Sequence, residues 1–170
     1  SREGLDTHNL YLETILKYSF GVIALNKDKK IQLINPVIGK ILQIEDESIF
    51  VGQRYDDIIK EYNNLSPLFS FIEEKVDQGL IEWSGEIELT LKDRHCLIYC
   101  QGAVLDVENK KLGYVIIIND ISKLNRAQKK AAWGEVAVRM AHEIKNPLTP
   151  ILLSAQRLRN LFLEKLESKD

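Results

Sequence analysis

The sequence predicts an α+β fold: a five-stranded antiparallel sheet with flanking helices, followed by a long, coiled-coil-like helix. Three observations support this prediction. Two short apolar stretches beginning at Gly21 and Ile31 flank a polar turn, and three longer alternating stretches fill residues 81–120. Short helical patterns lie between these two groups of strands. Beyond residue 122, apolar residues recur at helical spacing instead.

Length and composition are those of a soluble globular chain. The 170 residues allow one ordinary domain and an extra element, with 45% hydrophobic and 28% charged residues. The net charge of −2 gives no electrostatic reason to expect nucleic acid as a partner. No apolar run approaches the ~20 residues that span a bilayer. The start lacks both methionine and a signal peptide, so we expect an excised piece of a longer protein.

The first elements follow from local patterns. Helical spacing in Tyr11–Tyr18 predicts an N-terminal helix within residues 1–19. A buried strand is expected at 21–25 and an alternating strand at 31–35, on either side of a polar turn. Asn35 and Pro36 then predict a helix start, with Asn as the cap and Pro at the first helical position.

The middle of the chain predicts further helices and then the longer strands. A short helical turn is expected at residues 55–59, and Ser66-Pro67 begins a helix that ends near Gly79. The three strands are expected at residues 81–91, 95–106 and 111–120.

This order of elements resembles a PAS domain over residues 20–121. The opening hairpin leads to Asn35, and Asn119-Asp120-Ile121-Ser122 is similar to the Asp-Ile-Thr signature that ends the last PAS strand. Serine replaces threonine, but both offer a hydroxyl that can cap a helix. Asp120 and Ser122 are therefore expected to transfer the signal from sheet to helix, with Arg94 as one candidate partner of the carboxylate.

No ligand of this domain can be named from the sequence. Cys96 and Cys100 lie on one predicted strand and would point to the same face, too far apart for an ordinary disulfide. Flavin photoreceptors of this fold carry a cysteine in the earlier helical region, and its haem sensors carry a histidine on the central helix; residues 66–78 contain no histidine. His95 is expected at an exposed hairpin tip.

From residue 122 to the end, the pattern predicts a connector helix that continues into a long amphipathic helix over residues 122–170. Its apolar positions, spaced alternately four and three apart, are Ala137, Ala141, Ile144, Leu148, Ile151, Ala155, Leu158 and Phe162. Such a seam implies a parallel dimer. Pro147 and Pro150 interrupt the helical pattern, so a local bend is expected beside His142.

The stretch around His142 contains candidate chemistry. A zinc protease would need His-Glu-x-x-His, but Asn146 stands at the fifth position, and neither His8 nor His95 has the spacing to replace the missing ligand. No metal site is expected. The stretch instead resembles the H-box of histidine protein kinases, His-Glu-x-x-Asn-Pro-Leu. Its flanks, residues 133–137 and 139–141, are similar to NtrY-type nitrogen-regulation sensor kinases.

The resemblance implies roles for three residues. His142 would accept the γ-phosphate of ATP and pass it to an aspartate of a response regulator. Glu143 would accept the second ring N–H and stabilise the developing imidazolium, which suits the chemistry of a nucleophilic imidazole. Asn146 would help to position water for dephosphorylation of the regulator.

The resemblance also implies partners that are not in this chain. ATP and Mg²⁺ would bind to a separate ATP-binding domain of the parent kinase, so the 170 residues alone should be inactive. The expected partners are a second copy through the helical region, that ATP-binding domain and a receiver domain. The parent would be an inner-membrane protein with this portion in the cytoplasm. The alternative is a non-catalytic PAS scaffold for dimerisation or ligand binding, in which His142 is vestigial.

Overall fold

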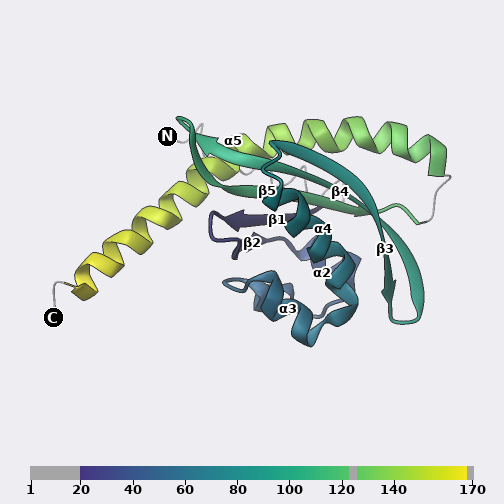
Figure 1. The fold of residues 1–170 in the computed structure, drawn as a ribbon, viewed down its shortest axis with the longest axis horizontal. Helices are drawn as coiled ribbons and strands as arrows, with labels where there is room; N and C mark the ends of the chain where they lie inside the picture. Colours follow the sequence, from purple (N-terminus) through teal and green to yellow (C-terminus); the bar gives the residue numbers. More distant parts are fainter. Residues whose placement is uncertain (1–19, 123–125, 168–170) are drawn as a thin grey trace.

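The structure, a computed structural model, describes residues 20–122 and 126–167, and the side chains of the last helix from Trp133 onward. The N-terminal helix expected within residues 1–19 lies outside the described residues. The remaining elements are a five-stranded sheet, three α-helices and two short 3-10 turns inserted after its second strand, and a long C-terminal helix (Figure 1).

All neighbouring strands of the sheet are antiparallel, in the order β2-β1-β5-β4-β3. The strands are β1 (Gly21–Asn26), β2 (Ile31–Ile34), β3 (Glu82–Leu91), β4 (Arg94–Val107) and β5 (Lys110–Asp120). Their alternating and continuous apolar runs predicted these bounds to within about two residues. This order, with the helices inserted between β2 and β3, is that of a PAS domain.

The helices between β2 and β3 cover one face of the sheet (Figure 1). They are α2 (Pro36–Leu42), α3 (Tyr55–Glu61) and α4 (Ser66–Asp77), with 3-10 turns at Glu47–Phe50 and Asn63–Leu65. Their apolar side chains join those of the sheet in one core, which includes Ile38, Phe69, Ile98 and Ile116. On this face Gly102 makes room for the ring of Trp83, since a Cβ at Gly102 would lie 2.1 Å from the indole.

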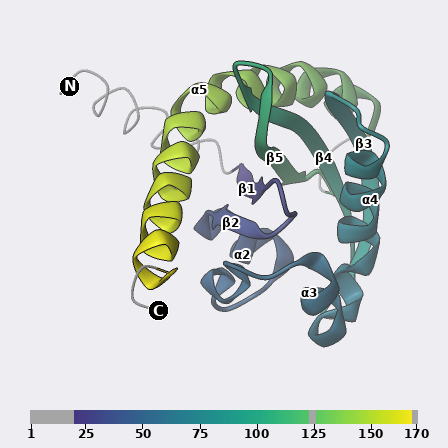
Figure 2. The ribbon, with the colours of Figure 1, turned by 60° about the vertical axis from the view of Figure 1, so that its left-hand side comes forward.

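The long helix α5 (Arg126–Glu167) covers the opposite face of the sheet. The sequence predicted a coiled-coil-like helix with an apolar seam for a second copy. In the structure, the first half of α5 turns back across β4 and β5 and places this seam on the sheet, and Figure 2 shows the helix wrapping around the sheet. A second apolar core fills this contact and includes Val22, Val115, Ile117, Ile144 and Leu148.

The two halves of α5 differ in their surroundings. Side chains are buried against the sheet as far as Leu152, whereas Leu158 and Phe162 are well exposed. Pro147 and Pro150 lie inside the helix, and Figure 1 shows α5 changing direction before its yellow C-terminal half leaves the sheet. A proline removes a helical hydrogen bond and crowds the preceding turn, which is a sufficient cause for such a bend.

Asn35 occupies the predicted N-cap position of α2, with Pro36 at the start of the helix, but its side chain makes no capping hydrogen bond. Its Oδ1 accepts from the backbone N–H of Val22 at 2.9 Å, and its Nδ2 donates to the carbonyl of Phe20 at 2.8 Å. The side chain therefore joins the start of α2 to the start of β1.

The cysteines lie where the sequence predicted. Cys96 and Cys100 are free thiols buried on the face of β4 that α2, α3 and α4 cover. Burial raises the pKa of Cys100 to about 12. Its thiol is therefore suited to packing and not to nucleophilic chemistry.

Replacement of Asn35 tests its double contact. We expect Asn35→Ala to lower the free energy of unfolding by about 1–3 kcal/mol, because two partly buried backbone groups lose their partner. Asn35→Asp is the matched control: it can still accept from Val22 but cannot donate to Phe20, and should fall between the two. Urea denaturation measures the series, and an unchanged Asn35→Ala protein would contradict the interpretation.

Candidate functional site

His142 lies on the part of α5 that crosses the sheet, at the boundary between its buried and exposed sides. Its neighbour Ala141 is buried, while the His142 side chain is 55% exposed. Asn146, one turn further along, is also exposed, and Glu143 is half-buried. Side chains separated by one turn share a helix face, so His142 and Asn146 form one exposed polar strip.

The carboxylate in contact with the imidazole comes from the sheet. Glu82 at the start of β3 places Oε1 2.8 Å from Nε2 of His142. The Glu82 side chain is 37% exposed, so water reaches this pair. Among the described residues, no hydrogen bond joins Glu143 to His142. Glu82 was not among the predicted site residues, because no local pattern relates an edge-strand acid to a helix so far along the chain.

The prolines alter the backbone around the predicted H-box. Helical hydrogen bonding runs from each N–H to the carbonyl one turn earlier, so Pro147 and Pro150 cannot donate to the carbonyls of Glu143 and Asn146. Between the two prolines, the Thr149 hydroxyl donates to the carbonyl of Lys145 at 2.7 Å. This type of contact also favours helix bending.

A polar cluster holds the end of β5. Asp120 Oδ1 accepts from the Ser122 N–H at 2.9 Å and from the Ser122 hydroxyl, while Oδ2 lies 3.1 Å from Nη2 of Arg94. The Ser122 hydroxyl oxygen in turn accepts from the backbone N–H of Leu97 at 2.8 Å. The structure thus brings Arg94, Asp120 and Ser122 together. The predicted capping of the following helix by Ser122 depends on residues 123–125, which lie outside the described residues.

One buried polar side chain lies between α5 and the sheet. Gln101 on β4 is 2% exposed, and its Oε1 has no hydrogen-bond partner among the described residues. Alternate residues of a strand share a face. Gln101 therefore lies on the same face as Tyr99 and Ala103, which pack in the clusters that contain Ala137 and Met140. The sequence offered no signal for this position, since a lone glutamine in a strand is usually solvated.

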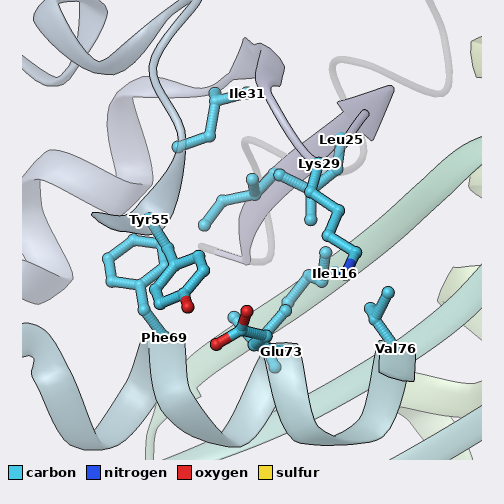
Figure 3. Close-up of a pocket in the computed structure, with 10 residues that line it drawn as sticks. Leu25, Lys29, Ile31, Tyr55, Phe69, Glu73, Val76 and Ile116 are labelled. Atoms are coloured by element: carbon cyan, nitrogen blue, oxygen red, sulfur yellow. The ribbon is translucent and has the colours of Figure 1, made fainter. Parts of the chain in front are cut away.

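A depression opens between α4, α3 and the opening hairpin, with ≈ 390 Å³ of unfilled space, part of it open to solvent. Its walls are apolar and include Leu25, Phe69 and Ile116, and Tyr55 and Glu73 lie at its rim (Figure 3). A hydrogen bond to Glu73 is the largest cause that raises the pKa of the Tyr55 hydroxyl, and a hydrogen bond to Asp56 is the next largest. The space enclosed within it is only ≈ 20 Å³, about that of a single water molecule, so the depression identifies no ligand.

Neither a metal site nor a membrane span was found in the part of the chain that the structure describes. Residues 20–122 and 126–167 contain no cluster of three or more histidine, cysteine, aspartate or glutamate side chains placed to hold a metal ion. No helix within the same ranges is both long enough and apolar enough to cross a membrane.

Known proteins resemble nearly the whole chain. Nitrogen regulation protein NtrY of Azorhizobium caulinodans is 30% identical over 163 residues, which cover 95% of this chain and 20% of that protein. A putative NtrY-like sensor histidine kinase of Rickettsia typhi is 41% identical over 73 residues, covering 38% of this chain and 12% of its own length. The chain therefore spans about a fifth or less of the length of these relatives.

Among solved structures, a PAS domain from Colwellia psychrerythraea aligns with 66% of this chain and 95% of its own, at 18% identity and a TM-score of 0.47. No protein-family model matches the chain. The fold assignment rests on the strand order and the placement of the helices, and the family assignment on the NtrY sequences. Together, these observations show a PAS domain followed by a long helix, in a segment that resembles the NtrY-type sensor histidine kinases.

Proposed function

We propose that this segment carries the phosphoacceptor of a two-component sensor kinase, and that His142 is that residue. The observation that carries the proposal is the exposed strip of His142 and Asn146 on α5, with Glu143 beside it. The imidazole is thus on the side of the helix that the apolar core does not enclose. The likeness to NtrY-type kinases supports this assignment.

The proposed reaction has two phosphoryl transfers. The outer ring nitrogen of His142, Nε2, uses its lone pair to attack the γ-phosphorus of ATP, the bond to the β-phosphate oxygen breaks, and ADP leaves with that electron pair. A carboxylate of a response regulator then attacks the phosphorus, the N–P bond breaks, and the imidazole is regenerated. ATP and Mg²⁺ would be supplied by the ATP-binding domain of the whole kinase.

Glu143 and Asn146 would serve opposite steps of this cycle. A carboxylate near the imidazole stabilises positive charge as the phosphorus is attacked. An amide one turn away offers a donor and an acceptor with which to position water near a phosphorylated receiver. The proposed partners are a second copy of the chain and the receiver domain.

We further propose that the cluster at the end of β5 transfers the signal. Asp120 and Ser122 link the last strand, the start of β4 and the connection toward α5. A change in the sheet that moves Arg94 or Leu97 would therefore alter the start of this connection.

We expect His142→Gln to abolish phosphorylation of this segment, because no other histidine of the given sequence lies in an H-box. A separately produced ATP-binding domain and labelled ATP provide the assay, with alkali-stable, acid-labile label as the signature of phosphohistidine. The matched control is His95→Gln, which alters an exposed histidine on β4 and should keep the wild-type rate. Label that persists in His142→Gln would overturn the assignment. A wild-type protein that takes up no label would favour the scaffold alternative.

The two neighbouring residues should affect different activities. We expect Glu143→Gln to slow phosphorylation by about 10–100-fold, because an amide supplies no charge to stabilise the imidazolium. Asn146→Ala should leave phosphorylation within about two-fold and chiefly impair dephosphorylation of the regulator. Labelling reactions quenched at successive times give the rate of kinase phosphorylation and the rate of regulator dephosphorylation separately. Equal losses of both activities in both variants would contradict distinct roles.

Asp120→Ala should leave the PAS domain folded, with a loss of about 1 kcal/mol, since the lost contacts are partly exposed. Kinase output should change, because the turn at Ser122 loses its acceptor. Asp120→Asn keeps an acceptor for the Ser122 N–H but removes the charge facing Arg94, and isolates the ion pair. Thermal melting and autophosphorylation of both variants provide the measurements; wild-type output in both would mean that the cluster is passive.

A further inference from the structure

The face of α5 that packs on the sheet is the face that the sequence predicts to pack on a second helix. Ala137, Ala141, Ile144 and Leu148 belong to the predicted seam, and each is at most 2% exposed in contact with the domain. A side chain enclosed by the sheet cannot simultaneously pack in a helical bundle. Docking on the sheet and pairing with a second copy are therefore mutually exclusive along this part of α5.

The docked arrangement also occupies the outer nitrogen of the imidazole. Glu82 Oε1 lies 2.8 Å from Nε2, the ring nitrogen farther from the helix backbone. This contact is favourable only when Nε2 carries a proton, because two lone pairs would otherwise face each other. A protonated nitrogen has no lone pair with which to attack phosphorus, and the carboxylate charge repels an approaching γ-phosphate.

The docked contact contains one unfavourable group. Among the described residues, Gln101 is the one buried side chain that is neither apolar nor aromatic, and its Oε1 lacks a partner there. A buried acceptor that loses water without gaining a donor weakens the contact that buries it. Release of α5 would return this oxygen to water, so the contact is less tight than an all-apolar one of the same size.

We propose that docked α5 is a resting state that withholds His142 from phosphorylation. In this state Glu82 is a positioning residue that covers Nε2. Burial of the apolar face of α5 stabilises the docked helix, and the unpaired oxygen of Gln101 limits that stability so that the helix can be released. The proposal rests on the proposed role of His142 as phosphoacceptor and adds a regulatory contact between the sensor sheet and that residue.

Two substitutions on the sheet, neither of them on α5, test the proposal in the whole kinase. Glu82→Gln removes the charge and should raise the initial rate of His142 phosphorylation by up to about five-fold, the range of an exposed ion pair. Gln101→Leu replaces the unpaired amide by an apolar side chain of similar size and should slow the rate by about five-fold or more.

Hydrogen exchange of the amides in residues 133–152 gives a readout that does not depend on phosphorylation. Exchange through opening of a helix follows the population of the open state. It should therefore quicken in Glu82→Gln and slow in Gln101→Leu, while exchange of α4 on the other face stays unchanged. Gln101→Met serves as a second apolar variant if Gln101→Leu folds poorly.

Glu61→Gln is the matched control for charge. It removes one exposed carboxylate from α3, on the face of the sheet opposite α5, and should change neither readout. A general gain in stability from Gln101→Leu would slow exchange in α4 as well as in α5, which would contradict a specific effect on docking.

The outcomes separate this proposal from the one it rests on. Wild-type phosphorylation at His142 with unaltered rates and α5 exchange in both sheet variants would overturn the resting state but leave the phosphoacceptor intact. Absence of label at His142 in the wild type would overturn the phosphoacceptor, whereas opposite shifts of α5 exchange in the two variants would still support docking.

Discussion

The central strands of this sheet are apolar on both faces, and each face must be kept from water. Alternate residues of β1 and β5 enter two separate cores, one under α2, α3 and α4 and the other under α5. Full burial of a Leu or Ile contributes about 1.5–3 kcal/mol, whereas an exposed ion pair contributes about 0–1 kcal/mol. Burial of Ile144, Leu148 and their neighbours therefore decides where α5 lies, and the Glu82 contact adjusts a position already set.

Polar side chains connect the layers at their ends. Asn35 joins α2 to β1, and Asp120 joins the end of β5 to Arg94 and to the turn at Ser122. Each satisfies backbone groups that would otherwise lack partners where a strand ends. These contacts fix the orientation of the chain at the two points where it passes from sheet to helix.

Most of the fold could be predicted from the sequence because its signals are local. Alternation predicted the strands, and a contiguous motif marked His142, Glu143 and Asn146. The site contacts were less predictable, because they join distant positions: Asn35 reaches back to Phe20 and Val22, and Glu82 meets His142 only through the docking of α5. The sequence also left open whether the apolar seam of α5 packs on a sheet or on a second helix. Ala137, Ala141, Ile144 and Leu148 suit a flat sheet as well as a neighbouring helix, and spacing alone does not distinguish the two.

Docking of α5 on its own domain has a consequence for assembly. The helix and the sheet belong to one chain and are joined by a short connection after Ser122, so each meets the other at an effective concentration that is about millimolar for short linkers. A second copy must compete with this built-in neighbour for the same apolar stripe. Self-association would then be weaker than the stripe alone could support, and any event that loosens the sheet contact would strengthen it without adding a single contact between the two copies.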